Sequence, residues 1–570
     1  MSNGNGVAPN AQRLLWAGFM AICASGVGFS IRGGILGQWG AQFGFTQGEL
    51  GGITGGGLTG FGITILFFSF FADRVGYGPL MAIGFLLHMA SAVVTLLATP
   101  IFNALGKDAT YQCLYWGMFL FALGNGTCEA VVNPLTATLF PKAKTHWLNI
   151  LHAGWPGGLI AGALLGWIFN SIGNVRWEIQ ISMFLIPTIL YGLMMFRQPF
   201  PHSEAKKHGV TIGRMMEEIG ILGAIVVIGL LGLWFSADVF PALGWSANLG
   251  WGLAAVLLVL YGFGTGFSAG HWMIAFLLVL HAMVGYVELG TDSWIQNVTG
   301  LILDDPKSGQ LLFIWTSALM FSLRFFAGPI VHKISPLGLL FGAAAIAAIG
   351  LFLLGTATTG LMCVVAATIY GIGKTYYWPT MLGVASERFP KGGALLLGAL
   401  GGAGMLSAGL LGGPGIGYKQ DYFASNHLKE GSAAAYERYR AESEKSFLFF
   451  PKISGLDQAK LAVLTDANGS GTTLQKDIAA LQQSGRTLSD DKNLEKLSGW
   501  WTAAQAEAEK DRAPVVEATL HGGKMALKWT ALVPLVMAGG YLLLIGYFRA
   551  TGGYKQVHIE GAGGEAREVE

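Results

Sequence analysis

Six ionisable side chains lie inside long apolar stretches of this sequence and are the first candidates for chemistry. They are Arg32, Glu129, His152, Glu288, Asp292 and Lys374. A charge surrounded by hydrocarbon costs several kcal/mol unless it is paired or hydrated, so such residues mark solute or proton pathways. No nucleophile–base, metal or phosphate-loop motif accompanies them. We therefore expect no enzyme, no cofactor and no metal site.

Three of these residues are carboxylates suited to proton coupling. Glu129 is in the middle of its stretch, where lost hydration favours its neutral form and a nearby cation favours its charged form. Glu288 and Asp292 are four residues apart and share one helix face. We expect Lys374 to form an ion pair with Asp292 or with Glu288. A Na⁺ site built from these two carboxylates is the minor alternative.

Arg32 admits three interpretations. It could be the ion-pair partner of Glu129, either during proton coupling or as a permanent salt bridge. Its planar guanidinium group could instead hold a carboxylate or phosphate of the solute through two hydrogen bonds. It could also lie near the end of its stretch and extend toward water. The sequence leaves the three open.

Aromatic rings and amides near these charges are candidates for binding a solute. An aromatic ring can stack on the apolar face of a sugar, and an amide can form hydrogen bonds with its hydroxyl groups. Aromatic residues in such stretches more often serve packing. With Arg32, His152 and Lys374, the predicted solute-binding residues are Asn125, Asn133, Asn149, Trp155, Trp294, Gln296, Asn297, Tyr377 and Trp378. We predict a gating role for Asp73 and Arg74, which lie in a connection.

The elements that position these residues are membrane-spanning helices. Of 570 residues, 52% are hydrophobic and 12% are charged, and mean hydropathy is +0.52. A bilayer core about 30 Å thick takes roughly 20 apolar helical residues to cross. The sequence predicts fourteen spans, near 14–36, 50–71, 80–99, 112–139, 148–170, 178–196, 219–237, 248–268, 272–298, 310–331, 337–356, 360–386, 393–417 and 526–548.

Basic residues between the spans predict the orientation. If the N-terminus is cytoplasmic, most Lys and Arg residues fall inside, and the short outer loops hold only Lys107, Arg176 and Lys307. We therefore expect a multi-pass protein of the cell (inner) membrane with both termini cytoplasmic and an uncleaved first helix. A net charge of +2 predicts no nucleic-acid partner, and four unpaired cysteines predict no disulfide framework.

A weak internal repeat divides the chain into two halves. Gly124-Asn125-Gly126 leads to Phe140-Pro141-Lys142, and Gly371-Ile372-Gly373 leads to Phe389-Pro390-Lys391. Two six-helix bundles with a solute site between them are typical of alternating-access transporters. We predict an N-terminal bundle at 1–200, a basic loop with two extra helices at 201–270, and helices seven to eleven at 271–417. A polar insertion at 418–524, the last helix at 525–548 and a cytoplasmic tail at 549–570 follow.

Two segments carry a family resemblance. Gly124 to Pro134 has the pattern G-x-G-x-x-E-x-x-x-N-P, and Leu148-Asn149 is followed by Pro156 and Gly158. They resemble the fucose–galactose–glucose:proton symporters of the major facilitator superfamily. The resemblance implies that Glu129 is the proton-carrying carboxylate. This chain has Arg32-Gly33 where the family usually has Asn-Asp, and His152 and Trp155 where it has Gln and Asn.

These observations predict an all-α integral membrane protein with the major-facilitator fold. The leading hypothesis is proton-coupled symport of a sugar by a monomer in the lipid bilayer. One alternative is transport of an anionic metabolite, a sugar acid or organic acid, held by Arg32. Another is a sensor on the same fold, which the outer insertion would favour. That insertion is either decorative, or a cap or a docking domain.

Overall fold

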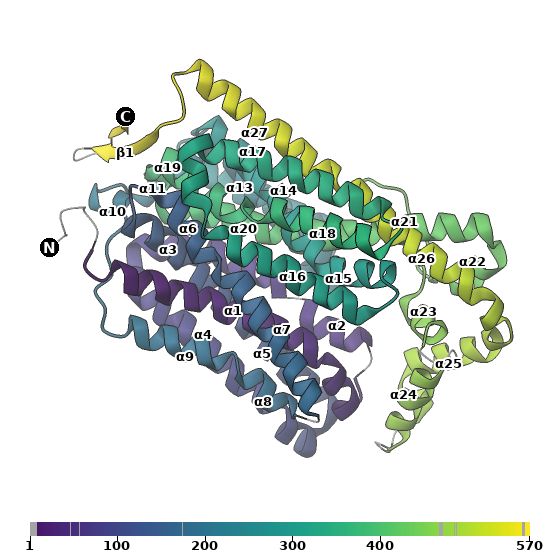
Figure 1. Ribbon diagram of the computed structural model, residues 1–570. Helices are drawn as coiled ribbons and strands as arrows, with labels where there is room; N and C mark the ends of the chain where they lie inside the picture. Colours follow the sequence, from purple (N-terminus) through teal and green to yellow (C-terminus); the bar gives the residue numbers. More distant parts are fainter. Residues whose placement is uncertain are drawn as a thin grey trace.

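Long helices run side by side through the body of the protein, and both chain ends lie at one end of this bundle (Figure 1). The computed structural model describes residues 8–45, 47–55, 57–173, 175–466, 471–483, 485, 487–560 and 565–569. We call the end that carries both termini the termini end. The inserted segment lies at the opposite end, which we call the insertion end.

The first half contains six helical rods, three of them broken into two helices. They are α1 (Ala11–Phe43), α2 (Gln47–Gly55) with α3 (Gly57–Val75), α4 (Tyr77–Leu96), α5 (Ala98–Leu139), α6 (Lys144–His152) with α7 (Gly154–Ile172), and α8 (Trp177–Ser182) with α9 (Leu185–Met195). α5 bends at Gly106, where φ is 81°. The predicted span began at 112, so the helix starts earlier than the hydropathy pattern indicated.

Two further rods follow the first half. They are α11 (Ile212–Trp234), continued by a π-helix (Phe235–Val239) and α12 (Phe240–Ala242), and α13 (Asn248–Gly264). A short α10 (Glu204–Lys207) precedes them. Gly220 bends α11 with φ of 61°, and a Cβ there would lie 2.1 Å from the Gly270 nitrogen. Only glycine therefore fits that bend, which separates the first turns of α11 from its apolar part.

The second half repeats the six-rod plan. It comprises α14 (Trp272–Gly285), a π-helix η2 (Tyr286–Gly290) and α15 (Thr291–Ile302); α16 (Pro306–Arg324); α17 (Ala327–Thr356); α18 (Gly360–Lys374) with α19 (Tyr377–Arg388); α20 (Gly393–Ser407), a π-helix η4 (Ala408–Gly412) and α21 (Gly413–Gly431); and α26 (Ala508–Thr530) with α27 (Leu532–Ala550). Short 3-10 helices cover Pro390–Gly392, Leu488–Asp490 and Gln505–Glu507.

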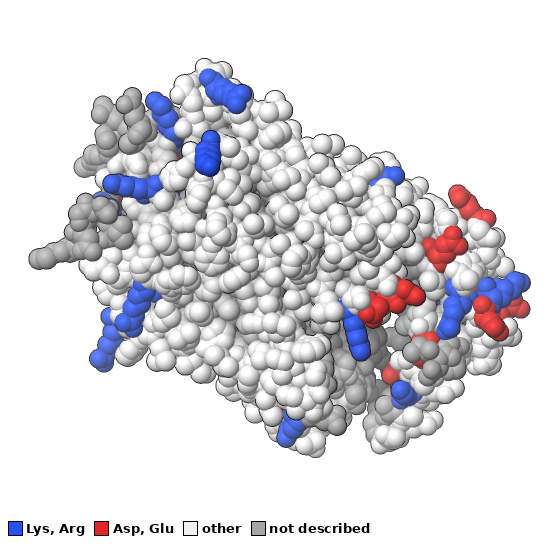
Figure 2. Space-filling view, in the orientation of Figure 1, with Lys and Arg blue, Asp and Glu red and all other residues white. Residues whose placement is uncertain are grey.

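Ten helical segments of the described chain are long and apolar enough to cross a membrane. The remaining rods are α5, α13, α16 and α18 with α19, so the long described helices form fourteen rods, as many as the spans that the sequence predicts. Of these four, α5, α16 and α18 carry Glu129, Arg324 and Lys374. Figure 2 shows a broad face without Lys, Arg, Asp or Glu between the two ends, as expected for a surface against lipid.

The insertion is a helical subdomain with its own core. Its helices are α22 (Ala433–Tyr439), α23 (Gln458–Leu464), α24 (Thr472–Gln483) and α25 (Lys492–Ala504). Tyr439, Leu464 and Val515 are buried in this core. α21 and α26 extend the eleventh and last rods outward and pack together, and a Cβ at Gly522 would lie 2.5 Å from the Gln420 carbonyl oxygen. The predicted boundaries at 417/418 and 524/525 thus fall inside continuous helices.

Replacing residues 432–507 by a short Gly/Ser linker is expected to leave the membrane bundle folded. This cut keeps the packed pair α21 and α26, and closing a loop adds only about 0.6 kcal/mol per doubling of its length. Size-exclusion chromatography in mild detergent should show one monodisperse peak for the variant and for wild type. Aggregation of the variant alone would show that the subdomain is a structural part of the bundle.

A two-stranded antiparallel hairpin ends the chain at the termini end. It pairs β1 (Gln556–Glu560) with β2 (Glu565–Val569). β1 lies against the end of α19, and the side chain of Ile559 is buried with Ala205 and Met215. The tail therefore packs on the bundle rather than extending away from it.

Candidate functional site

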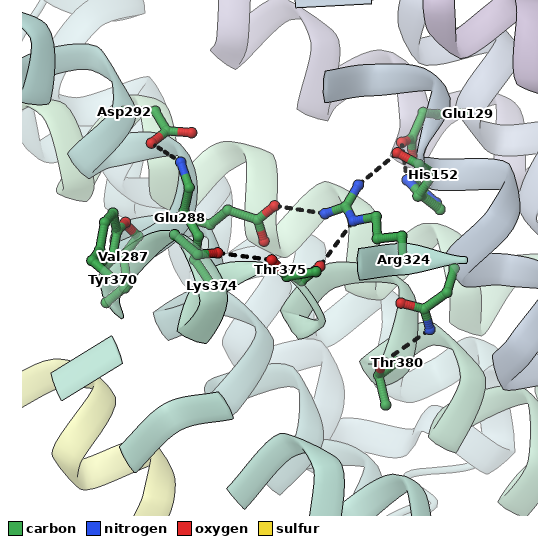
Figure 3. A network of polar contacts seen from close by, with 12 residues as sticks. Glu129, His152, Val287, Glu288, Asp292, Arg324, Tyr370, Lys374, Thr375 and Thr380 are labelled. Atoms are coloured by element: carbon green, nitrogen blue, oxygen red, sulfur yellow. Dashed lines mark hydrogen bonds and ion pairs between the residues drawn. The ribbon is translucent and has the colours of Figure 1, made fainter. Parts of the chain in front are cut away.

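A buried polar network joins the two halves of the bundle (Figure 3). Glu129 and His152 come from the first half, and Glu288, Asp292, Arg324 and Lys374 come from the second. Arg324 is 1% exposed and Lys374 is fully buried. Five of these six residues were predicted from the sequence, and Arg324 was not.

The first-half part of the network is a triangle of three side chains. Asn133 Nδ2 donates to Glu129 Oε2 at 3.0 Å, and His152 Nε2 lies 2.8 Å from Asn133 Oδ1. His152 Nδ1 is 3.8 Å from Glu129 Oε1. Glu129 also faces the second half, because a Cβ at Gly401 of α20 would lie 4.0 Å from Glu129 Oε2. The carboxylate therefore sits at the interface between the halves.

Arg324 connects this triangle to the second half. Its Nη1 donates to the His152 backbone carbonyl at 2.5 Å, its Nε donates to the Thr375 carbonyl at 2.8 Å, and its Nη2 donates to Glu288 Oε1 at 3.1 Å. The guanidinium thus spans the interface with three hydrogen bonds. One of its partners is charged, which strengthens that bond.

Two prolines explain why those carbonyls are free. A proline has no N–H, so the carbonyl four residues before it loses its helical partner. Pro156 stands four residues after His152, and Pro379 stands four residues after Thr375. α6 ends at His152 and α18 ends at Lys374, so each helix breaks beside the freed carbonyl. Both carbonyls then accept from the same guanidinium.

The other two carboxylates are positioned by α14, η2 and α15. Glu288 lies in the π-helix η2, a geometry that is frequent at functional sites. Tyr370 donates its hydroxyl to the Val287 carbonyl at 2.8 Å and so holds η2 against α18. Asp292 forms an ion pair with Lys374, at the end of α18. Of the two predicted ion pairs of Lys374, the one with Asp292 is confirmed, and Glu288 forms an ion pair with Arg324 instead.

A ladder of contacts joins the halves between this network and the termini end. Asn149 Nδ2 donates to Thr380 Oγ1 at 3.1 Å, and Thr145 Oγ1 donates to Glu387 Oε1 at 2.7 Å. Nearer the end, the Ala394 N–H donates to Asp73 Oδ2 at 3.2 Å. Asp73 thus lies at a contact between the halves, whereas Arg74 contributes its backbone carbonyl to Lys206. These contacts hold the two halves together at the termini end.

The C-terminal tail is attached to these contacts. Tyr554 donates its hydroxyl to Glu387 Oε2 at 2.8 Å, and the Ile559 N–H donates to Glu204 Oε1 at 3.1 Å. Lys144 of the first half contacts Glu204 Oε2 at 3.2 Å. Burial would raise the pKa of Glu204, but Lys144 and the Ile559 hydrogen bond lower it overall. Glu204 therefore stays charged and holds both segments.

Several predicted residues lie apart from this network. Asn125 Oδ1 accepts a hydrogen bond from His88 Nε2 at 2.9 Å inside the first half, and Tyr377 is buried with its hydroxyl 3.5 Å from the Ala343 carbonyl. Trp294 donates to the Gly413 carbonyl at 2.9 Å. Trp155 packs against Phe29, Gln296 is half-buried and Asn297 is exposed. Trp378 borders the network, because its ring packs against His281 and its backbone lies beside Glu288.

Arg32 is buried inside the first half, and its contacts explain why. Its Nη2 donates to Ser91 Oγ at 2.9 Å, and its guanidinium carbon lies 3.9 Å from the Phe121 ring centre and 4.9 Å from that of Phe184. Among the described residues, no carboxylate lies within ion-pair distance of it. The pairing with Glu129 is therefore wrong in this structure, where Asn133 and His152 surround Glu129 instead.

Replacing Arg32 by Lys is expected to lower the free energy of unfolding by about 2 kcal/mol, because an ammonium loses the planar stacking on Phe121. Solute affinity should not change, since the contacts of Arg32 lie within the first half. Thermal unfolding and binding of neutral and acidic solutes measure the two effects. If the variant binds acids tenfold more weakly at unchanged stability, the interpretation that Arg32 binds an acidic group of the solute is restored.

Arg324 is the residue that sequence reasoning missed. It lies within the predicted span 310–331 and is the last residue of α16. The available signal was the pair of prolines, which marks two carbonyls that need a donor. Helix boundaries read from hydropathy could not show that the last residue of α16 points inward.

Known membrane transport proteins are similar to this chain in sequence. The family model of the Major Facilitator Superfamily matches residues 18–413. The chain is 27% identical over 187 residues to the cis,cis-muconate transport protein of Acinetobacter baylyi, an alignment that spans 32% of this chain and less than half, 42%, of that relative.

Two solved structures share the fold. A structure of the proton:xylose symporter XylE bound to 6-bromo-6-deoxy-D-glucose aligns with a TM-score of 0.54 at 13% identity, covering 73% of this chain and 90% of that one. The fucose:proton symporter FucP of E. coli aligns with a TM-score of 0.50 at 14% identity, covering 72% and 91%. At such identities the likeness shows the fold alone.

Proposed function

The chain belongs to the Major Facilitator Superfamily and is a multi-pass membrane protein, and from this premise we propose that it is a secondary transporter working by alternating access. The proposed cargo is a small polar solute, with a neutral sugar as the leading class, moved together with protons. The buried network between the halves is the proposed site, since transporters of this plan bind solute at mid-membrane between their repeats.

The charge balance of the network carries this proposal. It holds three carboxylates, Glu129, Glu288 and Asp292, and two cations, Arg324 and Lys374. Each cation takes one carboxylate, and Glu129 is left with an amide and an imidazole. A buried carboxylate that forms no direct ion pair with Arg or Lys favours its protonated form. Glu129 is therefore the group best suited to bind and release the coupling proton.

The same balance favours a neutral solute. Both cations of the network are already engaged by carboxylates, so the charge of an acid bound there would be buried without a partner. Hydroxyl groups of a sugar could instead bond to Asn133, Asn149 and His152 without adding charge. This extends the sequence hypothesis of sugar:proton symport and replaces Arg32 by the triangle around Glu129 as the proposed solute contact.

An organic acid is the second candidate. The muconate transport protein is the observation that favours it, because muconate is a dicarboxylate. In that case the acid would have to displace Glu288 from Arg324 or Asp292 from Lys374. A solute carrying its own carboxylate could do so while Glu288 or Asp292 takes a proton.

Thermal stability of the purified protein with a panel of solutes separates the two. A solute that binds only the folded protein stabilises it by about 2.7 kcal/mol at 100 times its Kd. We expect at least one neutral sugar to raise the melting temperature and cis,cis-muconate and sugar acids to leave it unchanged. If only acids raise the melting temperature, the neutral-sugar proposal is wrong and the solute is an organic acid.

We further propose that the termini end is cytoplasmic and that the membrane is the cell inner membrane. Lys and Arg side chains project from the termini end in Figure 2, whereas the insertion end carries a mixture of acidic and basic residues. Basic residues concentrate on the cytoplasmic side of membrane proteins. With this orientation the ladder of contacts between the halves is a cytoplasmic gate, with Asp73 as one of its gating residues.

A further inference from the structure

A cavity of about 680 Å³ lies on the outside of the first half, between α4 and α9 near the termini end. Its walls come from both helices and from the segment after α9. The apolar lining residues include Met81, Ala82, Phe85, Ile189, Leu193, Phe196 and Phe200. Cavities of this size and composition bind ligands of mostly apolar surface.

This cavity opens on a surface that faces hydrocarbon. Leu86 of α4 is 63% exposed, and Ile186 and Leu193 of α9 are 62% and 64% exposed. Such large apolar side chains are exposed on the two helices because lipid surrounds them. An acyl chain can therefore enter the groove sideways from the bilayer, whereas a water-soluble ligand would have to cross that apolar surface.

One end of the groove is basic. Arg197 and His202 belong to its lining, and the Arg197 guanidinium carbon lies 5.2 Å from the Phe196 ring centre. Arg197 has φ of 54°, a left-handed conformation that costs a residue with a side chain about 1 kcal/mol or more. Glu204, the acid next in sequence, is already held by Lys144 and Ile559. The rim thus presents positive charge to an anion.

We propose that this groove is a binding site for one anionic phospholipid, with an acyl chain along Phe85 and Leu193 and the phosphate beside Arg197. Charge complementarity selects the headgroup, since anionic headgroups bind basic pockets at the cytoplasmic ends of membrane helices. Each Lys or Arg near the headgroup contributes about 1 kcal/mol, which is about fivefold in affinity. The proposal is independent of the solute that the protein carries.

Native mass spectrometry of the full-length protein in detergent, with phosphatidylglycerol or phosphatidylcholine added, tests the proposal. Wild type should retain phosphatidylglycerol about fivefold better than phosphatidylcholine. Arg197→Gln should remove this preference, and Arg214→Gln, a basic residue paired with Glu217 outside the groove, should keep it. Ala82→Trp, which fills the groove from α4, should remove retention of both lipids, and Ile83→Trp on the next position should not.

The outcomes are separable. An unchanged phosphatidylglycerol preference in Arg197→Gln overturns the headgroup assignment, and unchanged retention in Ala82→Trp overturns the groove. The melting temperature of wild type and of each variant is measured with phosphatidylglycerol and, separately, with sn-glycerol 3-phosphate as a soluble probe. If sn-glycerol 3-phosphate raises the melting temperature as much as phosphatidylglycerol does, the groove binds a soluble anion and the lipid proposal is overturned.

Discussion

Glu129→Gln is expected to abolish concentrative uptake, so that the solute reaches only the external concentration, while solute exchange across the membrane continues. Gln keeps the shape of the side chain and its hydrogen bond with Asn133, but it cannot release a proton. Coupling is lost because the two access states no longer differ in protonation at this site. Uptake into proteoliposomes under an imposed pH gradient measures the effect.

The matched control for this prediction is Glu178→Gln. Glu178 is a carboxylate of the same half that pairs with Arg176 near the insertion end, away from the network. The Glu178→Gln variant should accumulate solute as wild type does. If Glu129→Gln also accumulates solute to the wild-type level, with intact exchange, Glu129 is not the coupling residue, and Glu288 or Asp292 becomes the expected proton carrier.

Arg324→Gln is expected to lower the free energy of unfolding by about 3–5 kcal/mol and to stop transport. Removing one partner of a buried ion pair leaves the other charge without compensation, and Glu288 is 3% exposed. The change also removes the donors to the His152 and Thr375 carbonyls. Chemical denaturation in detergent and uptake in proteoliposomes give the two readouts.

A double variant separates charge from geometry. Arg324→Gln with Glu288→Gln removes the unpaired carboxylate and should recover much of the stability lost in the single variant. Transport should stay absent, because the hydrogen bonds that tie His152 to the second half are still missing. If Arg324→Gln is as stable and as active as wild type, the network has no structural or functional role at that residue.

The sequence alone determined the membrane architecture and the short list of candidates. Apolar stretches of about 20 residues predict helices that cross a bilayer, because backbone groups in lipid must be bonded within the helix. Charged residues are rare in such helices, so Glu129, His152, Glu288, Asp292 and Lys374 could be identified without coordinates. The all-α major-facilitator fold that these patterns and the family resemblance predict is confirmed.

Tertiary structure decided which of these residues meet. Helical periodicity places residues on a face, but the rotation of each helix and its neighbours are set by packing. Glu288 and Asp292 share a face in sequence terms, yet they pair with different cations, Arg324 and Lys374. Arg32 is as buried as Glu129, with exposed fractions of 2% and 6%, but its side chain contacts Phe121 and Ser91.

The junctions between elements also depended on the fold. Pro156 and Pro379 can be read from the sequence, but only the approach of α16 brings the guanidinium of Arg324 to both freed carbonyls. The polar insertion could be predicted from its composition. That α21 and α26 continue as one packed pair into it could not, because polar helices carry no hydropathy signal and gain their stability from contacts made across the fold.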